Sequence, residues 1–239
     1  MIKTVSLVGI AVAAVSFGST GAARAEVPAP PPPTESAPPL RGEGGALEFG
    51  LRTGYGIPLG RFGKSDDAAS DQKVTTIIKG VVPVWIDAGY RFNPRLYAGL
   101  SFQYGFGLLS GDLCSSGQSC SVSDLRLDAN VLYHVTPGRP ADLWLGFGVG
   151  YEWLELSVSA PGFSSSESAG AFEFANFQAG VEVAVNRAFA LGPFASFSLG
   201  TFRRAAIESP TITGTMDVAD KSLHEWLLFG VRGTVDLHI

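Results

Sequence analysis

Charged residues, cysteines and long apolar segments are all scarce in this sequence. Asp, Glu, Lys and Arg account for 16% of the 239 residues, whereas about a quarter is usual in a soluble domain. After residue 25, no apolar run reaches the ~18 residues that a membrane-spanning helix requires. These shortages argue against a highly charged soluble domain and against a helical membrane protein.

Glycine, aromatic and apolar residues are abundant instead. The chain holds 30 glycines, 11% aromatic residues and 46% hydrophobic residues. Such a composition is typical of a glycine-rich β protein with little surface in water, and it is too apolar for a disordered chain.

The first 25 residues have the features of a bacterial secretory signal peptide. Lys3 precedes an apolar run over 5–17, and Ala23-Arg24-Ala25 forms a cleavage site. We therefore expect a signal peptide over 1–25, a Pro-rich periplasmic linker over 26–45 and a barrel domain over 46–239. Removal of the signal peptide lowers the net charge from −5 by two units, to −7, which argues against nucleic acid as a partner.

The two cysteines, Cys114 and Cys120, enclose the loop-like stretch SSGQS. In an exported chain this spacing favours a local disulfide over free thiols. A metal site is less favoured, because no histidine or further cysteine lies nearby to complete it.

From residue 46 onward, apolar and polar residues alternate in eight segments. In LWLGFGVGYEW (143–153), one face is bulky and apolar, whereas the other carries three glycines and Glu152. A period of two predicts β-strands. The eight segments are 47–57, 82–92, 96–105, 125–135, 143–153, 175–185, 191–200 and 227–239.

The connections between these segments alternate in length. Short connections lie at 93–94, 136–142 and 186–190, and long polar connections lie at 60–76, 108–122, 157–170 and 203–221. An even number of strands with short turns at one end and long loops at the other is typical of outer-membrane barrels. The sequence predicts an all-β fold: an eight-stranded antiparallel up-and-down transmembrane β-barrel with short periplasmic turns and long extracellular loops.

The apolar rows are expected to face lipid. They carry large side chains on nearly every strand, and the interior of an eight-stranded barrel is too narrow to hold so many. Their length meets the ~9–11 residues that a tilted spanning strand needs, and aromatic residues such as Tyr90 and Trp153 fall near the two ends. The alternative is a soluble barrel with the apolar rows turned inward around a ligand.

At this point the chain resembles the small eight-stranded outer-membrane barrels of the OmpA/OmpX-like group. The alternating segments from Ala46 to Ile239 carry the resemblance. It implies the bacterial outer membrane as location, with membrane lipid and lipopolysaccharide as partners. It also implies that the barrel assembly machinery reads the C-terminal strand, which here ends in Ile239 where the group has an aromatic residue.

Ten charged residues share the inward parity. We interpret them as a salt-bridge network that fills the lumen, in preference to an ion pathway, because buried charges are tolerated when paired. The ten are Glu48, Arg52, Asp87, Arg91, Arg126, Asp128, Glu152, Glu182, Arg232 and Asp236.

Catalytic and metal-binding patterns are weak. Ser222, His224 and Glu225 lie together, but Glu225 has the opposite parity, and no G-x-S-x-G motif occurs. The acidic loop 63–71 is more typical of a solvated surface than of a cation site. No catalytic residue, metal or cofactor is therefore expected.

The sequence thus predicts a non-enzymatic outer-membrane protein with a structural or surface-interaction role, in adhesion or envelope integrity. The long external loops would contact any ligand, since loops on a rigid scaffold carry variable recognition. A lipid A-modifying enzyme and a small pore remain as alternatives.

Overall fold

The structure is a computed structural model that describes residues 44–61, 73–111, 114, 117–218 and 223–238. All of these belong to one compact unit, Ala37–Ile239. The signal peptide 1–25 and nearly all of the linker 26–45 lie outside the described residues, so both stay predictions. Within the described ranges, no helix is long and apolar enough to cross a membrane.

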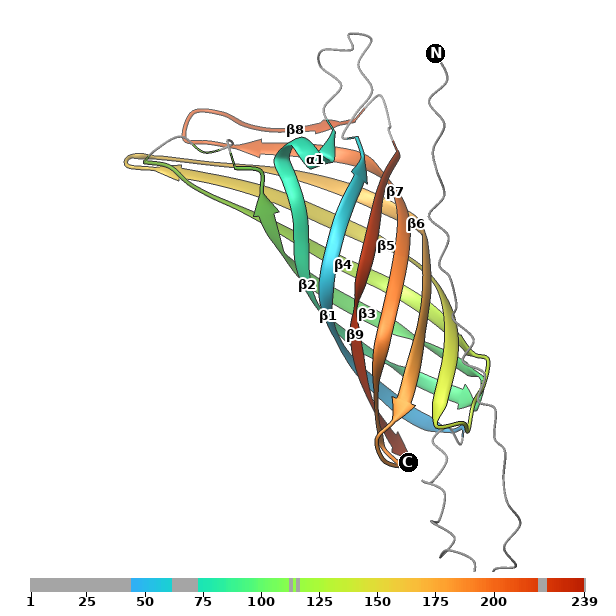
Figure 1. Cartoon of the computed structure of the whole chain (residues 1–239). Coiled ribbons are helices and arrows are strands. Elements are labelled where there is room, and N and C mark those ends of the chain that lie inside the picture. The colour runs from blue at the N-terminus through green and yellow to red at the C-terminus, as the bar shows by residue number, and fades with distance from the viewer. Residues whose placement is uncertain (1–43, 62–72, 112–113, 115–116, 219–222, 239) are drawn as a thin grey trace, which may run out of the picture. The chain divides into compact units, whose positions relative to one another are not determined.

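Eight antiparallel strands form a closed barrel (Figure 1). Each strand pairs with the next along the chain, and the last pairs with the first, so the predicted fold is confirmed. Closure satisfies the backbone hydrogen-bonding groups, as lipid demands of a spanning sheet. The strands are β1 (Ala46–Gly60), β2 (Ile78–Asn93), β3 (Leu96–Leu109), β4 (Ser119–His134), β5 (Ala141–Ala160), β6 (Phe163–Ala184), β7 (Phe189–Glu208) and β9 (Leu223–His238).

Two further elements lie at the end that carries the long connections. The helix α1 (Val74–Ile77) precedes β2, and the short strand β8 (Thr213–Asp217) pairs with β7 outside the ring. We call this end the loop rim, and we call the opposite end, with connections at 94–95, 135–140 and 185–188, the turn rim.

Asparagine side chains hold two of the short turns. Asn93 Oδ1 accepts hydrogen bonds from the backbone N–H groups of Arg95 and Leu96, at 2.9 and 3.0 Å. Asn186 Oδ1 accepts in the same way from Ala188 and Phe189, at 2.9 and 2.8 Å. A short asparagine side chain readily substitutes for a backbone acceptor in a turn, which explains how these strands reverse within a few residues.

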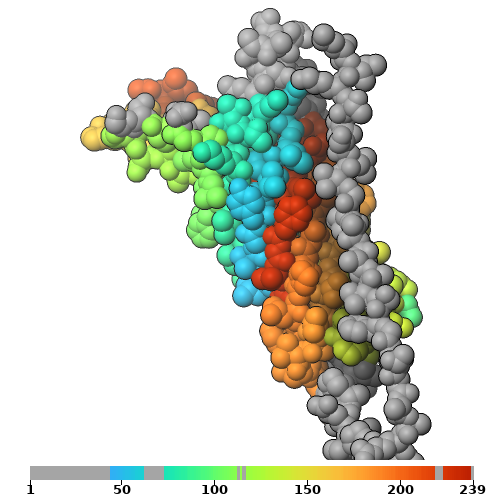
Figure 2. All heavy atoms as spheres, viewed as in Figure 1, coloured from blue at the N-terminus to red at the C-terminus, as the bar shows by residue number. Residues whose placement is uncertain are grey.

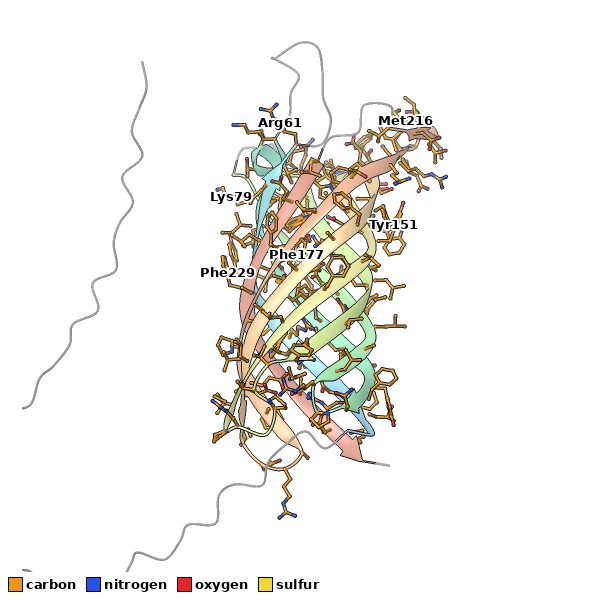
Figure 3. The ribbon with its side chains drawn as sticks, turned by 90° about the vertical axis from the view of Figure 1, so that its right-hand side faces the viewer. Arg61, Lys79, Tyr151, Phe177, Met216 and Phe229 are labelled. Carbon is orange, nitrogen blue, oxygen red and sulfur yellow. A yellow bond between two sulfur atoms is a disulfide. The ribbon has the colours of Figure 1, made fainter. Side chains whose placement is uncertain are left out.

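The apolar rows lie on the outside of the barrel. Leu51 and Leu100 are 59% and 58% exposed, and Phe177 and Phe229 lie on the outer surface in Figure 3. The alternate residues point inward, and Glu48 has no exposed surface. The predicted orientation of the two faces is therefore the observed one. Burial of each large outward side chain in lipid contributes about 1.5–3 kcal/mol.

The prediction of a long polar loop over 157–170 is wrong. β5 continues to Ala160 and β6 begins at Phe163, with Pro161 and Gly162 in the turn between them. Gly162 has a φ of +77°, a conformation that a Pro-Gly turn requires and glycine adopts without strain. The low hydrophobicity of this serine-rich stretch hid its strand character.

The predicted loop 203–221 also contains strand residues, because β7 runs to Glu208 and pairs there with β8. A bulge in β6 interrupts the alternation just below the predicted sixth segment. The register shifts between Glu173 and Ala175 relative to β7. Ala175 stays opposite the outward Leu199, but Glu173 and Asn176, three positions apart, are both buried.

Candidate functional site

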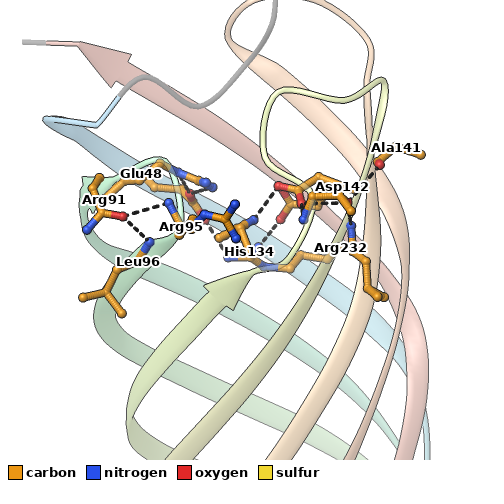
Figure 4. Close-up of polar contacts among 12 residues, drawn as sticks. Glu48, Arg91, Arg95, Leu96, His134, Ala141, Asp142 and Arg232 are labelled. Carbon is orange, nitrogen blue, oxygen red and sulfur yellow. Dashed lines mark hydrogen bonds and ion pairs between the residues drawn. The ribbon is translucent and has the colours of Figure 1, made fainter.

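The lower half of the lumen, toward the turn rim, contains a chain of ion pairs (Figure 4). Arg91 donates to Glu48 Oε2 from Nε and Nη2, at 3.0 and 2.5 Å. Arg232 donates to the other oxygen of Glu48 at 2.8 Å, to Asp87 at 3.3 Å, and also to Glu182. Each carboxylate thus lies beside at least one guanidinium, which is the condition under which buried charge is tolerated.

Arg52 connects this network to an aromatic layer. Its Nε lies 2.6 Å from Asp87 Oδ2, and its Nη1 donates to Gln178 Oε1 at 2.6 Å. The guanidinium carbon lies 5.2 Å from the ring centre of Trp85 and 5.7 Å from that of Trp144. Cation–π attraction therefore adds to the ion pair.

Arg126 is the centre of the upper half of the lumen. Its guanidinium lies 3.0 Å from Asp124, 3.1 Å from Glu173 and 3.4 Å from Glu152. The same guanidinium lies 4.9 Å from the ring centre of Trp226. These side chains join β4, β5, β6 and β9 across the lumen and fill its cross-section with paired charge and aromatic rings.

The structure places all ten sequence-predicted lumen residues in the barrel interior, each no more than 3% exposed. It brings Glu48, Asp87, Arg91, Glu182 and Arg232 together directly. Asp128 lies apart from that group and accepts a hydrogen bond from Ser101 at 3.4 Å.

Sequence reasoning missed two charged members of the upper lumen, Asp124 and Glu173. Asp124 continues the i, i+2 row of Arg126 and Asp128, so a strand started one residue earlier would have included it. Glu173 lies beside the bulge in β6, where simple alternation fails, so no sequence pattern indicated its inward position.

His224 is buried, and its contacts differ from those that a catalytic Ser/His/acid set would require. Its Nε2 lies 2.8 Å from Glu152 Oε2, and its ring stacks on Phe202 with the ring centres 4.1 Å apart. Ser222 lies outside the described residues, so the structure does not bring the set together. His134 lies at the turn rim, with Nδ1 2.7 Å from Asp142 Oδ2 (Figure 4).

Metal-ligating side chains do not gather in groups of three or more anywhere in the described ranges. The acidic loop 63–71 lies entirely outside those ranges, so its cation-binding alternative stays open. Cys114 and Cys120 form the disulfide that the spacing favoured.

Five neighbouring strand segments continue past the barrel at the loop rim, and we call them the extension. They project sideways from the barrel (Figures 1 and 2). The segments are 119–122 of β4, 154–160 of β5, 163–170 of β6, 204–208 of β7, and β8.

One face of the extension carries hydroxyl groups, and we call it the hydroxyl face. Its strand pairs align Ser121, Ser157, Ser166, Glu208 and Thr213 in one row. On β5 this row follows Trp153 and Glu155 at every second position, so the hydroxyl face continues the lipid-facing side of the barrel. We call the band of lipid-facing apolar side chains around the barrel the apolar belt, and the change from Trp153 to Glu155 marks where it ends on β5.

The other face is aliphatic and continues the inward side of the barrel. We call it the aliphatic face, and a labelled Met216 marks its outer edge in Figure 3. The alternation thus inverts above the apolar belt, because inward positions become apolar as outward positions become polar. Glu167 lies on this face between Leu156 and Ile207, and the apolar members of the face are Val122, Leu154, Leu156, Ala169, Ala205, Ile207 and Met216.

A cavity of about 390 Å³ lies against the aliphatic face. Ile77 and Ile78, from α1 and the start of β2, form part of its lining, and Glu167 is its one charged lining residue among those described. Sequence reasoning missed this cavity. Leu154 and Leu156 were the available signal, since they continue the inward row of Gly150 and Glu152 with large apolar side chains.

These features define a class: a closed membrane β-barrel with an apolar outer belt and a lumen filled by paired charges. The chain belongs to the outer membrane protein beta-barrel domain family, whose match covers residues 10–197. It is therefore a bacterial outer-membrane protein, as the sequence predicted.

Two solved structures, those of the Thermus thermophilus protein and OprG, share the fold at TM-scores of 0.50 or above. A major outer membrane protein from Thermus thermophilus is 14% identical, with a TM-score of 0.51 over 80% of this chain and all of that one. OprG from Pseudomonas aeruginosa is 14% identical, with a TM-score of 0.50 over 84% of this chain and all of that one. Neisserial surface protein A is 14% identical, with a TM-score of 0.46 over 78% of this chain and 95% of that one. The sequence matches no curated protein.

Proposed function

We propose that this chain is a non-enzymatic outer-membrane protein whose extension has a surface-interaction role in envelope integrity, through contact with lipopolysaccharide sugars. The observation that carries the proposal is the position of the hydroxyl face. It continues the lipid-facing side of β5 directly beyond Trp153, so it faces the sugar layer that borders the outer leaflet. The family consists mostly of non-enzymatic barrels, which agrees with this role.

The chemistry of the hydroxyl face suits a polyhydroxyl partner. A groove of about 510 Å³ on this face is lined mainly by serines, with Glu155 and Glu208 at its sides. Ser157 Oγ donates to Glu155 at 3.2 Å. Ser165, which has the opposite parity but lines the groove, donates from Oγ to the backbone carbonyl of Glu208 at 3.2 Å. Serine hydroxyls both donate and accept, so they can exchange these bonds for bonds to sugar hydroxyls.

The rigidity of the extension supports the same role. Its segments are joined by continuous strand pairing from β4 to β8, so the hydroxyl groups keep fixed spacings. A preorganised surface loses less conformational entropy when it binds a partner than a flexible loop does.

The test is a variant with four hydroxyl groups removed, Ser157→Ala, Ser159→Ala, Ser164→Ala and Ser166→Ala. Its matched control replaces the same four serines by threonine, which keeps the hydroxyl groups. We expect the alanine variant to retain less than half of the lipopolysaccharide that co-purifies with the wild type, and its cells to become sensitive to deoxycholate. The threonine variant should match the wild type. Equal lipopolysaccharide retention and equal sensitivity in all three would overturn the proposal.

A further inference from the structure

The cavity on the aliphatic face is formed by closely packed side chains and is not a gap between loops. Ile78, Val122 and Leu154 line it and are 1%, 6% and 6% exposed. They belong to a buried cluster that also contains Val74 and Phe202. Close packing behind the lining fixes the shape of the cavity, so an occupant would not have to order its walls.

The size of the cavity limits the occupant to a small molecule. Its volume of about 390 Å³ lies within the usual range for ligand pockets, roughly 300–1,000 Å³. A dry apolar cavity of about 150 Å³ holds one benzene molecule. By that comparison, the cavity holds on the order of ten to fifteen carbon atoms.

The lining defines the chemistry of the occupant. Most side chains against the cavity are aliphatic, among them Ile77, Leu156 and Met216, and Ser168 and Glu167 are the polar residues in the described lining. The charged group in the described lining is the carboxylate of Glu167, which repels carboxylate and phosphate head groups. An uncharged aliphatic molecule therefore fits the lining best, because it buries apolar surface without leaving a charge unpaired.

The side of the sheet on which the cavity lies indicates that its occupant is a free molecule and not a membrane lipid. The lining residues of β4 and β5 have inward parity, in the same rows as Arg126 and Glu152. The outer leaflet contacts the opposite faces of these strands, so its acyl chains do not reach the cavity along the barrel wall. Below the cavity, Arg126, Glu152 and Phe202 are paired or stacked across the lumen, so the site is closed toward the turn rim.

We propose that this cavity binds a free, uncharged aliphatic molecule with on the order of ten carbon atoms, taken up from the outside at the loop rim. The site lies on the opposite side of the extension from the hydroxyl face, so this proposal is independent of the lipopolysaccharide contact.

The experiment uses the mature barrel in lipid nanodiscs with 1-decanol as the probe. Methyl-labelled methionine gives a reporter at the cavity, since Met216 is the one methionine besides Met1. Methyl-labelled isoleucine reports on Ile77 and Ile78 from the opposite wall. We expect saturable shifts of these signals in the wild type. Shifts that rise linearly with 1-decanol and never saturate would overturn the proposal, because they would show partition into the lipid.

Two alanines on β7 are replaced by phenylalanine as a matched test and control. Ala205 lines the cavity, so Ala205→Phe fills it and should weaken the apparent affinity at least tenfold. Ala195 lies on β7 at a lipid-facing position, so Ala195→Phe should leave the shifts unchanged. If Ala205→Phe does not fold, as judged by heat-modifiable mobility, Ala169→Leu replaces it. Unaltered binding in a folded cavity-filling variant would overturn the proposal.

Two further arms test the charge and the source of the occupant. Decanoate should bind at least severalfold more weakly than 1-decanol, and Glu167→Gln should reduce that difference. Equal affinities for 1-decanol and decanoate would overturn the proposal that the occupant is uncharged. Nanodiscs with shorter or longer acyl chains, without 1-decanol, should leave the Met216 signal in place. A shift that follows the acyl-chain length would show that a lipid chain is the occupant.

Discussion

Arg91 and Glu48 form a two-point contact inside the barrel, with Nε and Nη2 of the arginine donating to one carboxylate oxygen at 3.0 and 2.5 Å. The two residues lie on paired strands, β2 and β1, and both side chains are almost fully buried. The other oxygen of Glu48 accepts from Arg232. One carboxylate therefore lies between two buried guanidinium groups, and Arg232 also pairs with Asp87 and Glu182.

The substitution Glu48→Ala should destabilise the barrel strongly. It removes the carboxylate that lies between Arg91 and Arg232, and removal of one partner from a buried ion pair costs about 3–5 kcal/mol. We expect the free energy of unfolding in urea, measured in detergent or lipid, to fall by this amount. Glu155→Ala is the control, because Glu155 is exposed on the extension and surface changes stay within about 0.5 kcal/mol. Similar losses for both variants would contradict the role of the ion pair.

Glycine in the lumen rows makes room for large rings, and Tyr97 shows the clearest case. A Cβ atom on Gly89 would lie 2.6 Å from Tyr97 Cζ, and one on Gly99 would lie 2.7 Å from the same atom. Tyr97 is 1% exposed. The ring thus occupies the space that two missing side chains leave on neighbouring strands.

Gly99→Ala should therefore lower the free energy of unfolding by about 1–3 kcal/mol, the usual cost of overpacking. Gly233→Ala is the matched control on β9, since a Cβ atom there would approach Phe189 to 3.4 Å, an ordinary contact. Urea unfolding followed by tryptophan fluorescence measures both. A Cβ atom on Gly99 would also lie 2.5 Å from the backbone oxygen of Ala88, so a Gly99→Ala variant as stable as Gly233→Ala would show that both the ring and the β2 backbone can move aside.

Local alternation was sufficient to predict the barrel. Each spanning segment shows the period of two without interruption, and the lumen row of Glu48 and Arg52 was readable because lipid and lumen demand opposite chemistry. The alternation also indicated that Trp144 faces inward. It did not reveal how the lumen holds such rings, since Trp144 needs the space at Gly180 on β6, and sequence spacing says nothing about cross-strand register.

The extension was harder to predict for a physical reason. Above the apolar belt, the outward row of β5 changes from Trp153 to Glu155 and Ser157, so a strand there resembles a polar loop. The inward row changes in the opposite sense, to Leu154 and Leu156. A search for strands that requires apolar outward positions therefore stops at the belt, and it misses both the paired segments and the cavity.

The disulfide between Cys114 and Cys120 should stabilise its own loop and not the barrel. In the loop-closure treatment, a link across so few residues opposes local opening of the loop by about 2 kcal/mol. The loop joins β3 and β4 outside the apolar belt, so it can open while the barrel stays folded. We expect the double variant Cys114→Ser, Cys120→Ser to be cleaved faster by proteinase K at this loop, with unchanged urea unfolding of the barrel.

Reduction provides the internal control for that prediction. Dithiothreitol should accelerate cleavage of the wild type to the rate of the double variant, and it should leave the variant unaffected. If the double variant instead lost heat-modifiable mobility, the disulfide would be needed for the barrel itself.

The filled lumen predicts that the wild-type barrel forms no steady ion channel. The guanidinium of Arg126 lies 4.9 Å from the ring centre of Trp226 and contacts three carboxylates, one each from β4, β5 and β6. An eight-stranded barrel has an interior just wide enough for its own side chains, so this layer leaves no aqueous path. In a planar bilayer with concentrated KCl, we expect no stable ohmic conductance.

The double variant Arg126→Ser, Trp226→Ala should open that layer. It removes the largest side chains and leaves Glu152 and Glu173 without their guanidinium partner, so the resulting current should be carried by cations. Reversal potentials in a KCl gradient measure this selectivity. Trp153→Ala is the control, since Trp153 lies on the outer surface and its loss should produce no stable conductance. A steady current through the wild type would mean that the ion pairs line a pathway, and the pore would then displace the surface-interaction role as the better account of the lumen charges.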